Sequence, residues 1–163
     1  MSIVAIDPGT AHTGLVWMDR REILDAKTIA PGGAAVKADQ RLLMERARLI
    51  AECISDWMLD RPHGLVVIEG FVTFQGSSRG NAYTFQTPYL CGYLHRALMG
   101  ERIEVQLSSQ VFNKRSPRSM YAAREAMAAG EYPMKGSHLL KNEHTRSAAC
   151  HGLYWYARHK EGE

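Results

Sequence analysis

The stretch Ile3-Val4-Ala5-Ile6-Asp7-Pro8-Gly9-Thr10 joins a run of apolar residues to an acid and a tight-turn sequence. A short apolar run bounded by Pro and Gly is typical of a β-strand that enters a turn. A strand that is apolar along its length lies at the centre of a sheet covered on both faces. We therefore predict that residues Ile3 to Asp7 form a central strand, which brings an acid to the edge of a sheet.

The residues that follow this stretch predict two more strands and a long helix. Thr13–Met18 and Glu22–Ile29 are the strands, with Asp19-Arg20-Arg21 as the hairpin loop between them. Asp39–Leu59 is the helix, because its apolar residues recur every three or four positions at Leu43, Ala47, Ile50, Ile54 and Trp57. The chain thus begins with three strands that we expect to pair antiparallel.

The rest of the chain alternates between strands and helices. In order, we predict a buried strand Leu65–Glu69, a helix within Thr84–Met99 whose start Pro88 delays to Thr87 or later, a strand Ile103–Leu107, a helix Ser119–Ala129 and a helix Glu143–His159 with Asn142 as its N-cap. Three antiparallel strands followed by this alternation predict an α/β fold, a mixed sheet with helices on both faces. Residues 1–163 suffice for one core and contain no long linker, so we predict a single domain.

The composition excludes several classes of protein. Hydrophobic residues make up 45% and charged residues 23% of the chain, so disorder is not expected. No segment has the apolar length of a membrane span, and Met1-Ser2-Ile3-Val4 lacks the basic start of a secretion signal, so we expect no membrane partner. The three cysteines are far apart and form no CxxC pair, which favours a reduced, cytoplasmic protein over a zinc site.

The net charge of +3 is weak evidence for a nucleic-acid partner, but the basic residues are unevenly distributed. Asn113 to Arg124 contains no acid and carries four cations, Lys114, Arg115, Arg118 and Arg124. A local run of cations is what contact with phosphates requires. A solvated basic loop explains the same run, and charge alone slightly favours that simpler explanation.

Asp7 and Glu69 each close an apolar strand. If these two strands are adjacent and parallel, both carboxylates emerge at the edge of the sheet where α/β proteins form their sites. Two neighbouring acids repel each other unless a cation lies between them, and hard cations such as Mg²⁺ bind carboxylate oxygens. A loop cap or a salt bridge explains either acid alone, but the pair favours a metal site.

The last predicted helix adds a polar stripe. At 100° per residue, Glu143, His144, Ser147 and His151 lie within one arc of about 100°. Glu143 and His144 are in the first turn, where the helix dipole favours an anion. An exposed polar face explains this stripe as well as a site does, so the stripe by itself leaves both interpretations open.

Several motifs resemble those of the RuvC family of Holliday junction resolvases. Ile6–Thr10 with Thr13-Gly14 resembles the opening Asp-Pro-Gly-Ser/Thr motif, and Val66–Glu69 resembles the second motif, a strand that ends in the catalytic glutamate. Ser109-Gln110-Val111 is loosely similar to the Pro-x-x-Val-Lys region, and His144–Ala148 lies where the family has its third and fourth metal ligands. The resemblance spans nearly the whole chain, and its divergence is similar to that of phage-encoded members.

The resemblance implies a ribonuclease-H-like fold and a metal-dependent endonuclease that cuts four-way or branched DNA junctions. It implies two Mg²⁺ or Mn²⁺ ions per site, which activate water and stabilise the leaving oxygen. Asp7 would bridge the ions, Glu69 would hold one, and Glu143 or His144 would complete the other. His144 would alternatively orient the water or protonate the leaving group.

The chain departs from the family at Ser147, where the resemblance places an aspartate. A serine hydroxyl is a poor Mg²⁺ ligand beside a carboxylate. Three explanations remain open: Glu143, one turn earlier on the same face, takes over the role; the site is weakened to a junction-binding form; or the substitution was made to inactivate the protein. We favour Glu143 acting with His144 in a working enzyme.

The residues that we expect to contact DNA are Phe74, Arg79, Lys114, Arg115 and Arg118. In RuvC-like enzymes an aromatic residue of the loop that corresponds to Gly70–Asn81 stacks on an exposed base, and such stacking is worth about 1–3 kcal/mol per base. Phe74 is the better candidate for this role, because Phe71 directly follows a strand and fits core packing.

A four-way substrate also implies a homodimer, because paired cuts in strands of like polarity need two sites related by a two-fold axis. The long helix Asp39–Leu59 carries apolar residues off its main stripe, among them Leu42 and Leu49. We expect this part of the helix to meet a second copy of the chain.

Two other classes of protein share the opening motif. A YqgF-type RNA-processing nuclease remains an alternative, but it lacks a strand-terminal glutamate such as Glu69. An actin-like or Hsp70-like ATPase needs two such domains, which 163 residues cannot supply. A junction-binding protein without activity is the third alternative, and Ser147 is the residue that keeps it open.

Overall fold

The computed structural model describes residues 1–20, 22–32, 40–70, 86–107 and 134–159, which contain one five-stranded sheet. Its elements are β1 (Ile3–Asp7), β2 (Thr13–Asp19), β3 (Glu22–Ile29), α1 (Gln40–Met58), β4 (Val66–Gly70), α2 (Gln86–Ala97), β5 (Ile103–Leu107), the short 3₁₀ helix η2 (Ser137–Leu139) and α5 (Glu143–His159). The strand order across the sheet is β3-β2-β1-β4-β5. The apolar first strand is therefore central, as its sequence predicts.

The pairing of the strands follows from how they are connected. β1 pairs antiparallel with β2, and β2 pairs antiparallel with β3. β4 joins the other side of β1 in parallel, and β5 joins β4 in parallel, because a helix carries the chain back before each of these strands. The predicted mixed sheet is confirmed.

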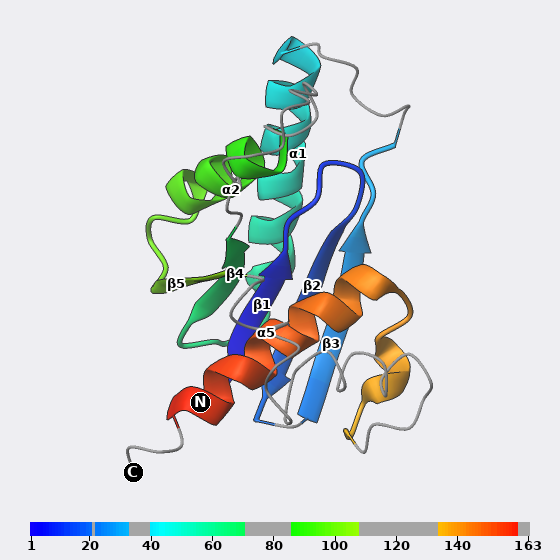
Figure 1. Ribbon diagram of the computed structural model, residues 1–163, viewed down its shortest axis with the longest axis vertical. Coiled ribbons are helices and arrows are strands. Elements are labelled where there is room, and N and C mark those ends of the chain that lie inside the picture. Colours follow the sequence, from blue (N-terminus) through cyan, green and yellow to red (C-terminus); the bar gives the residue numbers. More distant parts are fainter. Residues whose placement is uncertain (21, 33–39, 71–85, 108–133, 160–163) are drawn as a thin grey trace, which may run out of the picture.

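Helices cover both faces of this sheet (Figure 1). α1 and α2 pack on one face, over residues that include Ile6 and Ile68. α5 packs on the other face, over residues that include Ile3 and Ala5. Because successive residues of a strand point to opposite faces, the series Ile3, Ala5, Asp7 places Asp7 on the α5 face. The predicted arrangement of helices on both faces is confirmed, and it decides which helix covers the acid.

Four of the five residues of the apolar stripe predicted for α1 are buried, whereas Leu43 is only half-buried. Ala47, Ile50, Ile54 and Trp57 are buried, and the adjacent Ala51 and Met58 join them. No helix among the described residues is both long enough and apolar enough to cross a membrane.

Several element boundaries differ from the sequence predictions by about one residue. β2 extends to Asp19, which the sequence places in the hairpin loop, β4 is Val66–Gly70 rather than Leu65–Glu69, and α1 ends at Met58. α2 is described from Gln86, whereas Pro88 suggested a start at Thr87 or later. Pro88 is the third residue of the helix, where a backbone N–H has no partner within the helix, so the proline breaks no hydrogen bond. β4 continues to Gly70, because a Cβ there would lie 2.6 Å from Val105 of β5, and glycine leaves this space open.

Part of the prediction lies outside the described residues. This part comprises the helix Ser119–Ala129, residues 71–81 of the predicted DNA-binding loop and the basic run 113–124.

Candidate active site

The sheet places four residues of the site in one row. Asp7 is opposite Gly14 of β2, and Glu69 of β4 is opposite Gln106 of β5. The parallel register joins Ile6 to Ile68, so the next residues of these two strands, Asp7 and Glu69, end side by side. The row Gly14, Asp7, Glu69, Gln106 therefore crosses four strands on the α5 face. The expectation that both acids share one edge of the sheet agrees with this register.

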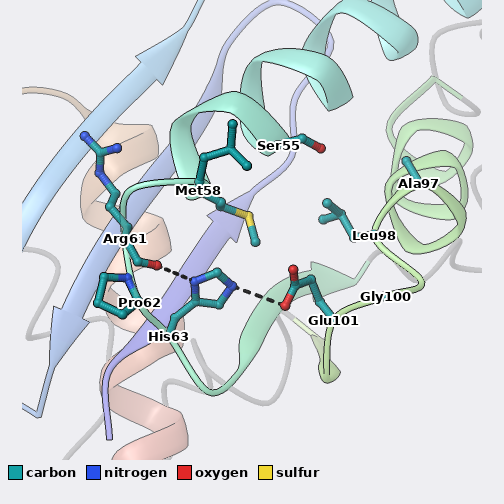
Figure 2. A pocket seen from close by; sticks show the side chains of 10 residues that line it. Ser55, Met58, Arg61, Pro62, His63, Ala97, Leu98, Gly100 and Glu101 are labelled. Carbon is teal, nitrogen blue, oxygen red and sulfur yellow. Dashed lines mark hydrogen bonds and ion pairs between the residues drawn. The ribbon is translucent and has the colours of Figure 1, made fainter.

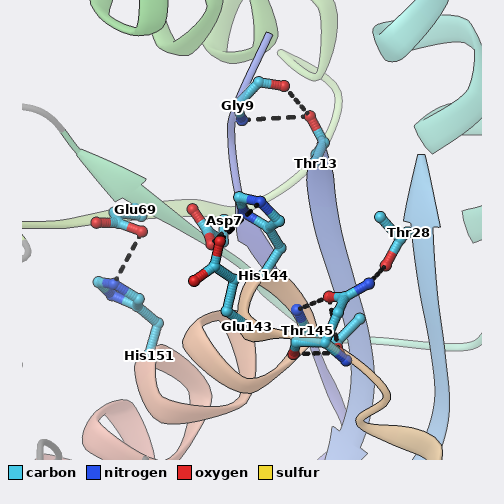
Figure 3. A network of polar contacts seen from close by, with 10 residues as sticks. Asp7, Gly9, Thr13, Thr28, Glu69, Glu143, His144, Thr145 and His151 are labelled. Carbon is cyan, nitrogen blue, oxygen red and sulfur yellow. Dashed lines mark hydrogen bonds and ion pairs between the residues drawn. The ribbon is translucent and has the colours of Figure 1, made fainter. Parts of the chain in front are cut away.

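α5 lies over this row and sets a histidine against each carboxylate (Figure 3). His144 Nδ1 is 3.3 Å from Asp7 Oδ2, and His151 Nε2 is 3.4 Å from Glu69 Oε2. The two histidines are seven residues apart, which is two turns of a helix, so they lie on one face. Two residues of the predicted polar stripe, His144 and His151, thus face the carboxylates.

Two features fix the first turn of α5 over Asp7. Asn142 caps the helix, because its Oδ1 accepts a hydrogen bond from the Thr145 N–H at 3.0 Å, and its Nδ2 donates to Thr28 Oγ1 of β3 at 2.6 Å. The predicted N-cap is confirmed. Gly14 lets the helix approach, because a Cβ at this position would lie 2.8 Å from the Thr145 nitrogen and closer still to the carbonyl of His144. The Thr-Gly pair of the opening motif therefore has a packing role.

The turn after β1 is held by the other residue of that pair. The buried Thr13 hydroxyl donates a hydrogen bond to the Gly9 carbonyl at 2.9 Å, and the Gly9 N–H donates to Thr13 Oγ1 at 3.3 Å. This turn carries His12, whose ring stacks on that of His144 with 5.5 Å between centroids. The rim of the site therefore has an exposed imidazole that sequence reasoning did not single out.

Burial is the largest influence on the ionisation of Asp7. Burial raises the pKa of Asp7 to about 6; the hydrogen bond from His144 opposes this rise, and the neighbouring Glu69 adds to it. Burial, with the charges of Glu69 and Asp7, likewise raises the pKa of the Cys91 thiol to about 11. Cys91 donates a hydrogen bond to the Glu69 carbonyl at 3.5 Å. This thiol is therefore protonated at neutral pH and is not a nucleophile.

Asp7→Asn is expected to stabilise the metal-free protein at neutral pH. The pKa of Asp7 is raised on folding. The contribution of Asp7 to the free energy of unfolding is therefore fully present below about pH 4 and is lost as the pH rises through about 6. A rise of about two pKa units corresponds to about 3 kcal/mol. At pH 8 in EDTA, we expect the free energy of unfolding of the variant to exceed that of wild type by up to that amount. This gain in stability should shrink towards pH 4. Urea unfolding across this range measures it; a gain independent of pH would contradict the cause given.

The donor set at the row fits a divalent cation in its chemistry. Asp7 and Glu69 are two largely buried carboxylates, and the charge of Glu69 raises the pKa of Asp7; a cation between them would relieve this repulsion. Across the described residues, no three His, Cys, Asp or Glu side chains converge as a ready-made metal site. The two acids are therefore the candidate ligands, and each of them contacts one histidine of α5.

The other predicted site residues have different positions. Glu143 is 66% exposed, and its Oε1 is 3.8 Å from His144 Nε2, so it reaches the site through the imidazole. Ser147 is buried on α5 between the turns that carry His144 and His151. Phe74, Arg79, Lys114, Arg115 and Arg118 lie outside the described residues, and their roles stay predictions.

Sequence reasoning assigned no role to two residues that the structure brings to Glu69. His151 was placed on the site-facing arc but was not counted among the ligands, and Gln106 was not singled out. The alternation of polar and apolar residues in Ile103–Leu107 gives no signal for Gln106, because it predicts a polar exposed face, whereas Gln106 is only 1% exposed and Val105 is 50% exposed. The contact between His151 and Gln106 depends on the register of β4 and β5, which cannot be predicted from the sequence.

A separate pocket of about 490 Å³ lies between the C-terminal ends of α1 and α2 (Figure 2). It is lined by residues that precede β4 and β5, including His63 and Glu101, whose side chains pair at 3.4 Å. The carboxylate row is at the opposite, C-terminal ends of these parallel strands. This pocket is therefore not part of the candidate active site.

Comparison with known proteins finds a likeness in structure. No family model and no curated protein matches the chain. The RuvC of Thermus thermophilus, in complex with Holliday junction substrate, matches with a TM-score of 0.68 and 18% identity over 98% of this chain and 96% of its own. The yeast mitochondrial Holliday junction resolvase matches with a TM-score of 0.66 and 10% identity, over 98% of this chain and 80% of its own.

A viral protein matches over a similar extent. The fowlpox virus resolvase, in complex with substrate Holliday junction DNA, has a TM-score of 0.51 and 12% identity over 96% of this chain and 99% of its own. At such identities the likeness shows the architecture alone. The predicted ribonuclease-H-like fold of the RuvC type is confirmed.

Proposed function

We propose, from this RuvC-like resolvase fold and its row of carboxylates, that the protein is a metal-dependent endonuclease that resolves four-way or branched DNA junctions. The observation that carries the proposal is the pair Asp7 and Glu69, side by side at the ends of two parallel strands beneath α5. A fold of this kind does not by itself imply an activity, so the proposal depends on the site. We further propose that it acts in the cytoplasm.

In this mechanism, Asp7 and Glu69 would hold Mg²⁺ or Mn²⁺. The bound ions, two per site in our proposal, would activate the attacking water and stabilise the leaving oxygen of the phosphodiester. His144 keeps Asp7 oriented through the 3.3 Å contact of its Nδ1. Its Nε2 faces Glu143 at the open side, where it would complete a ligand set, orient the water or protonate the leaving oxygen.

Two substitutions, tested side by side, distinguish the role of Glu143 from that of Ser147. If Glu143 acts with His144, Glu143→Gln should lower cleavage by about tenfold or more, an effect typical of losing a residue that orients a metal ligand. Ser147→Asp should then leave cleavage unchanged or reduce it, because it adds a charge at a buried position. Single-turnover cleavage of a labelled junction in Mn²⁺ measures both. A strong gain with Ser147→Asp would instead place the missing acid at residue 147.

The DNA contacts of the proposed enzyme involve Phe74, Arg79, Lys114, Arg115 and Arg118, as the sequence suggests. Phe74 would stack on an unpaired base at the junction, and the cations would bind phosphates, which carry no sequence information.

We also propose that the protein acts as a homodimer. Leu42 and Leu49 of α1 are about half exposed in the single chain, at 51% and 43%. Apolar side chains on one helix face support the expected contact with a second copy, and sedimentation with and without junction DNA tests it.

A cleavage assay tests the proposal. We expect a four-way junction to be cut in Mg²⁺ or Mn²⁺ but not in EDTA, with linear duplex and RNA–DNA hybrid cut far more slowly. Equal cutting of all three substrates would refute the specificity proposed. Junction binding without cutting in either metal would instead favour the second candidate, a junction-binding protein, for which Ser147 in place of an acid is the specific argument.

A further inference from the structure

Two buried polar residues, His151 and Gln106, lie next to Glu69 on the side of the protein interior. His151 of α5 is fully buried, with its Nε2 at 3.4 Å from Glu69 Oε2 and its Nδ1 at 3.4 Å from Gln106 Oε1. Gln106 is the residue of β5 directly opposite Glu69 in the sheet. Figure 3 shows the imidazole of His151 directed at the Glu69 carboxylate. A fully buried histidine between two polar groups is costly unless both of its contacts are favourable.

The orientation of Gln106 is fixed by its own neighbour. Gln106 Nε2 donates a hydrogen bond to Glu104 Oε1 at 3.4 Å, and Trp155 Nε1 donates to the other oxygen of Glu104 at 2.9 Å. Reversing the amide would set its oxygen against the Glu104 carboxylate, so Gln106 Oε1 must face His151. An acceptor at that position requires that His151 Nδ1 carry a hydrogen.

The remaining nitrogen of His151 therefore serves Glu69. With Nδ1 directed at Gln106, Nε2 is the atom that faces the carboxylate, 3.4 Å from Glu69 Oε2, so the imidazole bridges Gln106 and Glu69. This contact engages Oε2 of Glu69. A carboxylate anchored in this way has little freedom to rotate.

We infer that His151 and Gln106 are positioning residues, a buried clamp that orients Glu69 for the cation of the proposed nuclease site. The inference rests on the proposed function. Residues that hydrogen-bond a metal ligand from behind set its orientation, and their loss costs about 10–100-fold in metal affinity or activity. The clamp matters more in a chain with Ser147 on the same helix face, because a site with fewer acids depends on the geometry of those it has.

The test uses His151→Leu and Gln106→Leu, each of which removes the polar groups and keeps a buried side chain of similar size. We expect either variant to raise the Mn²⁺ concentration for half-maximal junction cleavage by about 10–100-fold. The rate at saturating Mn²⁺ should stay near that of wild type. Calorimetric titration of the DNA-free protein with Mn²⁺ should show the same loss of affinity. His151→Gln, whose amide can still donate to Glu69, should recover part of it.

Leu153→Val is the matched control, because Leu153 is buried in the same helix and belongs to the apolar core. It should lower the melting temperature without moving the Mn²⁺ requirement. A purely structural role for His151 would lower the melting temperature as the control does, with unchanged Mn²⁺ affinity, and that result overturns the inference. If His151→Leu does not fold, Gln106→Leu decides in the same way.

Glu69→Gln separates the clamp from the proposed function. If wild type cuts junctions and Glu69→Gln does not, while both clamp variants keep the wild-type Mn²⁺ requirement, only the clamp is wrong. If wild type neither binds Mn²⁺ nor cuts junctions, the proposed nuclease and the clamp fall together.

Discussion

Asp7→Asn is expected to lower junction cleavage by at least about a thousandfold while junction binding stays the same or improves. Asp7 neighbours Glu69 in the row and contacts His144 of α5. Asparagine keeps the shape of the Asp7 side chain but not the charge that would hold a cation. Metal stabilisation of a transition state is worth several kcal/mol, and about 4 kcal/mol corresponds to a thousandfold in rate. Binding does not suffer, because loss of a negative charge lessens repulsion of phosphate.

Single-turnover cleavage and a gel-shift titration on the same junction measure the two effects. Asp56→Asn is a suitable control, since Asp56 is exposed on α1, which covers the face of the sheet opposite the row. It should leave both quantities unchanged. Cleavage by the Asp7→Asn variant at the wild-type rate would mean that the assigned mechanism is wrong.

Gly14→Ala should strongly reduce both the stability of the protein and its cleavage of junctions. The added Cβ would overlap the carbonyl of His144, so the first turn of α5 must move away from β2. Because the obstacle is backbone, we expect a loss of about 3 kcal/mol in the free energy of unfolding, at the upper end of overpacking effects. A displacement of about 1 Å at a catalytic group can cost about a hundredfold in rate, so cleavage should fall by at least that factor.

Gly92→Ala provides the matched control for Gly14→Ala. Gly92 lies on the exposed side of α2, and a Cβ there meets nothing within 4 Å. Alanine favours a helix over glycine by about 1 kcal/mol, so this variant should be neutral or slightly more stable. Thermal unfolding and cleavage rates distinguish the two. Equal behaviour of the two alanine variants would show that the close approach of α5 to β2 does not position the site.

The central strand, the two acids and the covering helices could be predicted because each depends on local pattern. Four apolar residues before Asp7 suffice to make β1 central, and the spacing of Ala47, Ile50 and Ile54 suffices to orient α1. The N-cap at Asn142 is equally local, since its acceptor oxygen needs only the next turn of helix. Such features are determined within a few residues along the chain.

The clamp on Glu69 could not be predicted in this way. The contact of His151 with Gln106 joins residues 45 positions apart, and it exists because β5 pairs with β4 in one particular register. A shift of one residue would turn Gln106 to the other face of the sheet. The choice between Glu143 and Ser147 had the same difficulty, because helical spacing places both on one arc but does not say which side chain remains in solvent.

Asp7 and His144 are in contact although 137 residues separate them along the chain. This separation affects the order in which the parts of the protein fold. Contacts between distant segments cost chain entropy before they add stability, so they tend to form after the local β1–β2–β3 meander. A newly made chain therefore has both acids long before α5 lies over them. During that interval Asp7 is hydrated and titrates like an ordinary aspartate. The proposed nuclease activity therefore requires the completed fold, with α5 in place over the carboxylates.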